Sequence, residues 1–377
     1  MEKTMKSQGI ERYRQVLRLG WLPLAIALAF IARSSAGQTA TPAPALLVLE
    51  KSDSMLAIVD PATLKIVARV AAGPDPHEIV ASPDGKLAYI SNYGGLDSSL
   101  NTISVVDVAA LKALPAIQLG ELHSPHGLSY AGDKLYFTAE TNKVIGRYDP
   151  LRKSIDWIMG IGQDRTHMVF ADETQDRIFT SNVNSGTISI LERFELPAPG
   201  PPPGAPPGAQ PPAPALQGQP HKTWRIANVP SGRGCEGFDV SPDRRELWAA
   251  NANDNTVTVI DLASRRAILT FPIPVDHANR LKFTPDGKRV LVSGLGAASA
   301  PNADNLAVLD VPTRKEIKGF ALGGGSAGIL ILPDGSLAYV AVSAKDKVVA
   351  IDLGKLEVVG QIPTGKNPDG LAWTGSQ

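Results

Sequence analysis

Three of the six histidines in this 377-residue sequence hold the same place in a repeated sequence unit. His77, His126 and His167 each open an alternating apolar stretch that leads into a turn, and Glu236 and Asp369 hold that place in two further units. Neutral imidazoles and carboxylates are ligands that zinc, copper and iron take in proteins. We therefore expect the three histidines to bind a divalent transition metal, with Glu236 as a further ligand.

Glu236 has a second candidate role. A carboxylate beside a metal-bound water can act as a general base, so Glu236 is also the candidate base of a metal-assisted hydrolase. The histidines lie far apart in the sequence and form no short ligand motif, so their meeting depends on the repeat. A metal-free site for a small polar molecule stays open as an alternative.

The repeated unit has the pattern of paired strands. Each copy reads as an alternating apolar strand, a turn built around Pro-Asp, and a second apolar strand. A third strand that closes on aspartate and a fourth strand follow most copies. The clearest copies are HEIVASPDGKLAYISN (77–92), EGFDVSPDRRELWAAN (236–251), NRLKFTPDGKRVLVSG (279–294) and AGILILPDGSLAYVAV (327–342). Four strands in roughly 40–50 residues are typical of a β-propeller blade.

The two ends of the chain supply a further blade. Residues 369–375 read as an isolated first strand, and residues 46–73 read as strands two to four. Joining the ends in one sheet closes the ring and leaves no open edge. The sequence thus predicts an all-β fold over residues 45–375. We expect a single seven-bladed β-propeller with four antiparallel strands in each blade, the last blade closed by the N- and C-terminal segments.

The unit also resembles a known repeat. The pattern Pro-x-Gly-x-x-x-Ser-Pro-Asp-Gly, then an apolar strand, Asn and Val-x-Val-x-Asp, is similar to the YVTN-type, WD40-like propeller repeat, and the resemblance covers residues 45–375. It implies the fold of the seven-bladed superfamily of quinoprotein amine dehydrogenase and cytochrome d1. It implies little about function, because one propeller scaffold carries many unrelated sites.

A second set of polar residues is expected beside the first. The last residue of each second strand lies next to the start of the inner strand, since the two strands run antiparallel. This pairing places Glu140 beside His126, where a carboxylate would fix the tautomer of a metal ligand. The residues expected to line the ligand site at the mouth of the central channel are Asp369, Asn279, Asn92, Glu140, Asn182, Asn251, Glu50 and Arg280.

Residues 1–36 are typical of a secretory signal. A basic start precedes an apolar run over residues 21–32, and small residues follow. The apolar run is shorter than the roughly 20 residues that a bilayer span needs, so we expect cleavage and export, to the periplasm or medium, without a stable membrane span. Residues 37–44 would be a linker.

Composition excludes several partners and cofactors. The full chain has a formal net charge of +0, and because residues 1–36 are basic the remainder is acidic, which argues against nucleic acid. The single cysteine, Cys235, excludes an intramolecular disulfide and a c-type haem. No dinucleotide fingerprint or phosphate loop occurs, so no nucleotide cofactor is expected.

Residues 195–220 are rich in proline and glycine and interrupt the third blade unit. Such a composition predicts a disordered insertion rather than packed structure. A tolerated loop and a docking site for a protein partner are both compatible with it.

These observations favour an exported binding propeller with a polar, histidine-rich mouth for a transition metal or a small polar ligand. The alternative is a metal-assisted or lactonase-like hydrolase that uses the same mouth. A third reading is a protein-interaction scaffold that uses the blade faces or the proline tract. No nucleophile motif such as Gly-x-Ser-x-Gly is present, so the sequence leaves open whether the protein is an enzyme.

Overall fold

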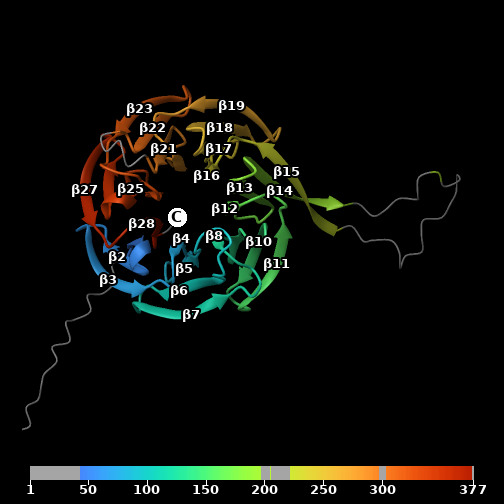
Figure 1. Cartoon of the computed structure of the whole chain (residues 1–377), viewed down its shortest axis with the longest axis horizontal. Coiled ribbons are helices and arrows are strands. Elements are labelled where there is room, and N and C mark those ends of the chain that lie inside the picture. Colours follow the sequence, from blue (N-terminus) through green and yellow to red (C-terminus); the bar gives the residue numbers. More distant parts are fainter. Residues whose placement is uncertain (1–42, 197–203, 205–220, 297–302, 376–377) are drawn as a thin grey trace, which may run out of the picture. The chain divides into compact units, whose positions relative to one another are not determined.

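The computed structural model describes residues 43–196, 204, 221–296 and 303–375. These residues form seven antiparallel sheets of four strands, arranged as a ring around a central channel (Figure 1). The predicted seven-bladed β-propeller is therefore confirmed. Two single-turn 3-10 helices, η1 (Lys51–Asp53) and η2 (Ser343–Lys345), are the only helical elements in this part of the chain.

The closing sheet joins the two ends of the propeller. β28 (Pro368–Trp373) is its inner strand and pairs with β1 (Leu46–Glu50), which is followed by β2 (Met55–Asp60) and β3 (Lys65–Ala71). The pairing runs from Leu46 opposite Trp373 to Glu50 opposite Pro368. The ring is thus closed by main-chain hydrogen bonds between segments at opposite ends of the sequence.

Each of the other six sheets takes its strands from one continuous stretch. The first two are β4 (Pro76–Ala81), β5 (Leu87–Asn92), β6 (Thr102–Asp107) and β7 (Lys112–Gln118), then β8 (Pro125–Ala131), β9 (Lys134–Ala139), β10 (Val144–Asp149) and β11 (Ser154–Gly160). The next two are β12 (Thr166–Ala171), β13 (Arg177–Asn182), β14 (Thr187–Leu196) and β15 (His221–Pro230), then β16 (Cys235–Val240), β17 (Glu246–Asn251), β18 (Thr256–Asp261) and β19 (Arg266–Pro272). The last two are β20 (Ala278–Phe283), β21 (Arg289–Gly294), β22 (Leu306–Asp310) and β23 (Lys315–Phe320), then β24 (Ile329–Ile331), β25 (Leu337–Val342), β26 (Lys347–Asp352) and β27 (Glu357–Pro363).

The hydrophobic core lies between neighbouring sheets. Leu49 of β1 and Ile90 of β5 belong to one buried cluster, and Trp248 of β17 and Val292 of β21 belong to another. Alternating strands bury one apolar face against each neighbour, which is why the sequence pattern repeats. The core therefore holds the blades in register around the channel.

The Pro-Asp turns are fixed by their own side chains. Asp84 accepts hydrogen bonds from Ser82 Oγ at 2.6 Å and from the Lys86 amide at 3.1 Å. These bonds lower the pKa of Asp84 to about 2, with the Ser82 hydroxyl contributing most. Asp243 and Asp286 repeat the arrangement with the hydroxyl two residues before each. A hydroxyl before Pro-Asp thus makes a tight local turn between inner and second strands.

The inner strands of neighbouring blades approach closely at glycines. A Cβ added to Gly127 in β8 would lie 2.5 Å from the carbonyl oxygen of His167 in β12, and one added to Gly370 would lie 2.7 Å from that of His77. A Cβ added to Gly237 would lie 2.5 Å from the carbonyl oxygen of Asn279. Glycine is required at these places because a side chain would push the next blade away.

The proline- and glycine-rich tract falls between β14 and β15, the third and fourth strands of their sheet. Residues 195 and 196, which we assigned to the tract, belong to β14. Residues 197–203 and 205–220 lie outside the described residues, as do the expected signal, residues 1–36, and most of the expected linker. Within the described part of the chain, no helix has the length and apolar character to cross a membrane.

Candidate functional site

The site residues begin the inner strands, at an irregularity that most blades share. In β4 the pairing with β5 shifts between Pro76 and Ile79, so that one extra residue is accommodated. The inner strands β8, β12, β16, β20 and β28 shift at the equivalent place. A β-bulge of this kind re-aims a side chain out of the regular alternation. His77, His126 and His167 all lie in these bulges.

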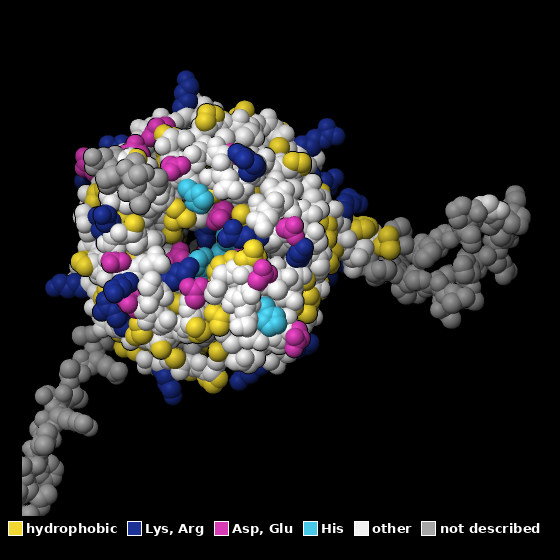
Figure 2. Space-filling model, viewed as in Figure 1, with side chains coloured by type: hydrophobic (Ala, Val, Ile, Leu, Met, Phe, Trp, Pro, Cys, Tyr) yellow, Lys and Arg dark blue, Asp and Glu magenta, His cyan; other side chains and the backbone are white. Residues whose placement is uncertain are grey.

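The three histidines come together at one end of the channel. The ring centroids of His77 and His126 are 4.4 Å apart, and those of His126 and His167 are 3.6 Å apart in a stacked arrangement. Tyr93 packs against His77 and His126 at 5.1 and 4.8 Å. Figure 2 shows the end of the channel as a central hollow in which histidine, acidic and basic side chains gather.

Two of the histidines have a carboxylate at Nδ1. His167 Nδ1 contacts Glu140 Oε1, and His77 Nδ1 lies 3.1 Å from Asp369 Oδ2. Glu140 was expected beside His126, but its carboxylate reaches His167 in the next blade and also accepts a 2.6 Å hydrogen bond from the hydroxyl of Tyr93, which follows β5 in the preceding blade. A carboxylate at Nδ1 fixes the proton there and leaves Nε2 of His167 with its lone pair when that imidazole is neutral. His77 differs, because the Lys51 ammonium, which can only donate, contacts the same Nδ1 atom.

His126 is the exception within this group. It is fully buried, and neither of its ring nitrogens has a hydrogen-bond partner among the described residues. Burial first, and then the charges of His167 and His77, lower the pKa of His126 well below its ordinary value. His126 is therefore a neutral imidazole with an unused lone pair in a buried place.

His167 lies between two carboxylates. Its Nε2 is 3.4 Å from Glu236 Oε2, and no hydrogen bond to Nε2 is formed within the described structure. Burial alone would lower the pKa of His167, but the interactions with Glu140 and Glu236 outweigh it and raise this pKa. Burial alone would raise the pKa of the Glu236 carboxyl, but the interactions with His167, Arg280 and Arg165 outweigh it and lower this pKa.

Three cations complete the group. Lys51 Nζ contacts His77 Nδ1 and lies 3.5 Å from Asp369. Arg165 Nη1 lies 3.6 Å from Glu236 Oε1, and Arg280 Nη2 donates a 2.5 Å hydrogen bond to Glu78 Oε1. We call the assembled residues the central cluster: Lys51, His77, Glu78, Tyr93, His126, Glu140, Arg165, His167, Glu236, Asn279, Arg280 and Asp369.

The central cluster has nearly balanced charge. Glu78, Glu140, Glu236 and Asp369 oppose Lys51, Arg165 and Arg280, which leaves one excess negative charge when the imidazoles are neutral. Burial raises the pKa of Asp369, an effect that Lys51 and Arg280 partly offset. Burial also lowers the pKa of His77, and the positive charge of Lys51 adds to it.

Several residues expected at the mouth lie elsewhere. Asn92, Asn182 and Asn251 are fully buried and direct their amides into the blades: Asn92 Nδ2 donates to the Ala72 carbonyl, Asn182 Nδ2 to Ser189 Oγ and Asn251 Nδ2 to Thr258 Oγ1. Glu50 accepts hydrogen bonds from Arg69 Nε at 2.8 Å and from the Gly365 amide at 2.7 Å. These side chains stabilise the blades, because their polar groups are already paired there.

Asn279 and Arg280 do join the central cluster, and Asn279 donates a 2.7 Å hydrogen bond to Glu236. Sequence reasoning missed Lys51, Glu78 and Tyr93. Each directly follows a residue that was singled out, namely Glu50, His77 and Asn92. At a bulge the next residue along the strand also turns toward the channel, and this signal was overlooked for Glu78. Lys51 and Tyr93 instead lie just beyond the ends of β1 and β5.

Two overlapping groups of side chains in the central cluster have the geometry to hold a metal ion. They are His77, Glu78 and His126, and His126, Glu140 and His167. Within each group the ligand atoms lie within 4.8 Å of one another, and His126 belongs to both.

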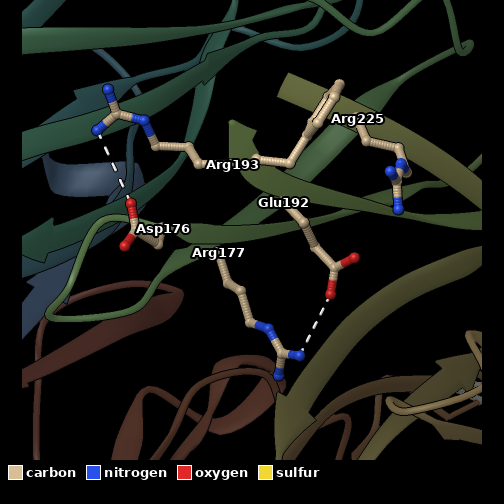
Figure 3. A pocket seen from close by; sticks show the side chains of 6 residues that line it. Asp176, Arg177, Glu192, Arg193 and Arg225 are labelled. Carbon is tan, nitrogen blue, oxygen red and sulfur yellow. Dashed lines mark ion pairs between the residues drawn. The ribbon is translucent and has the colours of Figure 1, made fainter. Parts of the chain in front are cut away.

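A second pocket, of about 300 Å³, lies on the blade of β13 and β14 (Figure 3). Its charged side chains are paired with one another: Arg177 Nη2 lies 3.2 Å from Glu192 Oε1, and Arg193 Nη1 lies 3.9 Å from Asp176 Oδ1. Arg225, which also lines the pocket, stacks over Phe194 at 4.8 Å. This pocket lacks the unpartnered buried groups that distinguish the central cluster.

Comparison with known proteins supports the fold and assigns no function. No protein-family model matches the chain, and no curated protein matches it. Among solved structures it is similar to hydrazine synthase of Kuenenia stuttgartiensis, with a TM-score of 0.59 and 17% identity over 79% of this chain and 89% of that one. A functionally unknown protein from Desulfotomaculum acetoxidans gives a TM-score of 0.66 and 12% identity over 88% and 99%.

A third similar structure is the dihydro-heme d1 dehydrogenase NirN in complex with DHE. It gives a TM-score of 0.55 and 16% identity over 87% of this chain and 74% of that one. At such identities the likeness speaks for the fold alone. By its sheets and by these comparisons, the chain is a seven-bladed β-propeller.

Proposed function

We propose that the protein is an exported binding propeller that holds one divalent transition-metal ion in the central cluster. His126 and His167 are the central ligands, and His77, Glu78 and Glu236 are the candidates for the remaining positions. The observation that carries the proposal is the buried His126 ring with neither nitrogen partnered by a described residue. An unsatisfied buried polar group costs about 1–3 kcal/mol, and a bound metal ion removes that cost.

Distances in the central cluster support the same assignment. Two ligand atoms that lie about 2.0–2.1 Å from a tetrahedral zinc ion are separated by about 3.4 Å. His167 Nε2 and Glu236 Oε2 are 3.4 Å apart, without a good hydrogen bond between them. Glu140 at the Nδ1 atom of His167 matches the carboxylate–histidine–metal arrangement, in which the carboxylate orients the ring.

The ligand set points to zinc, copper(II) or iron. Imidazole and carboxylate ligands without a thiolate suit these ions, whereas thiolate-rich sites suit copper(I) and iron–sulfur clusters. Cys235 is fully buried, and burial raises the pKa of its thiol to about 12, so it offers no thiolate. A bound ion would supply Lewis acidity to a ligand at the channel end.

The hydrolase alternative finds less support. A general base works best with a pKa near the working pH. Interactions with His167, Arg280 and Arg165 outweigh burial and lower the pKa of Glu236, so this carboxylate is a weak proton acceptor. Its Oε2 atom lies 3.4 Å from His167 Nε2, the separation of two ligands of one ion. We therefore assign Glu236 to the ion, and binding rather than catalysis to the protein.

Elemental analysis tests the metal site. The full chain is purified without a His tag or chelator, and the metal-free form is titrated with Zn²⁺, Cu²⁺ and Fe²⁺. We expect about one equivalent of metal in the wild type and loss of it in His126→Ala. His123→Ala is the matched control, because His123 lies in the loop before β8, where its amide bonds Asn142, outside the central cluster. Absence of stoichiometric binding of every ion, or full retention by His126→Ala, would overturn the proposal.

Export is a separate part of the proposal and rests on residues 1–36. Expression in a Gram-negative host followed by N-terminal sequencing of the periplasmic and medium fractions tests it. We expect a mature start after Ala36. An uncleaved chain that stays in the cytoplasm contradicts export but leaves the metal site untouched.

A further inference from the structure

The channel holds a cavity next to the central cluster. Its volume is about 580 Å³, and the inner strands of all seven blades line it. Small-molecule sites in proteins span roughly 300–1,000 Å³. Glu78 and Arg280 line this cavity as well as belonging to the central cluster, so the two spaces share an ion pair.

The wall of the cavity is apolar in its larger part, and Glu173, Asp239, Arg244 and Lys282 line it besides the Glu78–Arg280 pair. Phe170 in β12 is 36% exposed although it lines the channel, and Met168 and Leu330 are half-buried there. Covering apolar surface is worth about 25 cal/mol per Å². A ligand with an apolar body would gain this free energy in the cavity.

The shared ion pair crosses the channel. Glu78 belongs to β4 and Arg280 to β20, and their blades lie on opposite sides of the ring (Figure 1). Arg280 Nη2 donates to Glu78 Oε1 at 2.5 Å, while its Nη1 lies 3.6 Å from Glu236. The Glu78 carboxylate is also one of the potential metal ligands, together with His77 and His126. The Glu78 carboxylate can therefore either pair with the Arg280 guanidinium or bind the metal ion.

We propose that the cavity binds a monocarboxylate with an apolar body, and that a metal ion in the central cluster promotes this binding through Glu78. This inference rests on the proposed metal site. When the ion takes Glu78 as a ligand, the pair with Arg280 opens and the guanidinium receives the carboxylate of the ligand. Guanidinium–carboxylate pairs are strong and directional. Without the ion, the ligand must displace Glu78.

The charge of the central cluster favours the same class of ligand. With neutral imidazoles, the four carboxylates and three cations of the central cluster leave one excess negative charge, and a bound divalent ion turns it into one excess positive charge. A carboxylate neutralises that charge, and an ammonium group would add to it. In a site of low dielectric this difference in charge favours binding of a carboxylate head group over an ammonium head group.

Calorimetric titration with decanoate tests the proposal on the full-length chain, metal-free and loaded with Zn²⁺. We expect decanoate to bind at least about tenfold more tightly to the zinc form, and zinc to bind more tightly by the same factor when decanoate is present, because linkage is reciprocal. Decylamine and decanol, with the same chain length, are expected to bind the zinc form more weakly. Tighter binding of decylamine, or equal decanoate affinity in both forms, overturns the proposal.

Variants of the cavity wall locate the ligand. Phe170→Asp places a charge in the apolar wall and is expected to abolish decanoate binding while zinc stoichiometry stays at the wild-type value. Ile268→Asp is the matched control, on the outer strand β19 at a position that is 55% exposed. Leu330→Asp repeats the test should Phe170→Asp fail to fold. Wild-type decanoate affinity in a folded wall variant overturns the assignment.

Glu78→Gln separates this inference from the proposed metal site. The substitution removes the charge that pairs with Arg280, so decanoate is expected to bind with and without zinc. If the wild type binds no zinc and Glu78→Gln binds decanoate, the metal site fails and the cavity site stands. If zinc binds stoichiometrically and neither protein binds decanoate, the cavity site alone is overturned.

Discussion

Replacing Gly127 by alanine tests how the blades position the metal ligands. Gly127 follows His126 in β8 and faces the main chain of β12. The new Cβ would lie 2.5 Å from the His167 carbonyl oxygen and 2.7 Å from the Val169 amide nitrogen. Ordinary contacts begin near 3.4 Å, so the two inner strands must separate by about 0.9 Å at this point.

The size of the effect follows from this displacement. Overpacking of a well-packed interior costs about 1–3 kcal/mol. For a domain of this size one kcal/mol lowers the melting temperature by roughly 2 °C, so we expect a fall of about 2–6 °C. Because the strand that moves carries His167, zinc affinity should fall by about 10–100-fold, the range seen when the groups that orient metal ligands are altered.

Thermal unfolding measures the first effect, and competition with a chelator measures the second. Gly160→Ala is the control, because no atom lies within 4 Å of the Cβ that this change adds at the end of β11. If Gly127→Ala matches Gly160→Ala in melting temperature and in zinc affinity, close approach of the inner strands does not position His167 and the reasoning fails.

Three further results are expected. The Cys235 thiol, buried and with a pKa raised to about 12, should resist iodoacetamide at pH 8 in the native protein and react fully in guanidinium; rapid native alkylation contradicts the packing. Asp84→Asn should be less stable than wild type at pH 7, and urea titrations should show the difference shrinking as pH falls from about 4 toward 2. The reason is that a carboxylate with a depressed folded pKa stabilises the fold above its unfolded value and loses this effect on protonation; a constant difference contradicts it. Truncation after residue 367 removes β28 and exposes the edge of β1, so cooperative melting should be lost, whereas removal of residues 376–377 should change nothing; a cooperative truncated protein would show that closure of the ring is dispensable.

The sequence by itself determined the blades and their closure. Strand period and turn chemistry are local properties, so the Ser82-Pro-Asp84 turn and its counterparts are readable without tertiary information. The number of units, with three strands of a blade at the N-terminal end and one at the C-terminal end, then required that β28 pair with β1. The repeat register also placed His77, His126 and His167 at equivalent positions, because equivalent positions of a propeller converge on its axis.

The tertiary structure decided which side chains meet. Register within a blade placed Glu140 beside His126, but its carboxylate reaches His167 in the next blade. The bulges at the start of the inner strands turn two successive residues toward the channel, which brings Glu78 and Arg280 together from opposite blades. The polar Asn92 was placed at the mouth, although its amide donates to the main-chain carbonyl of Ala72, directly after β3 of the neighbouring sheet. Strand periodicity reports which face of a sheet a residue occupies; contacts between blades depend on bulge geometry and side-chain reach, which only the assembled ring fixes.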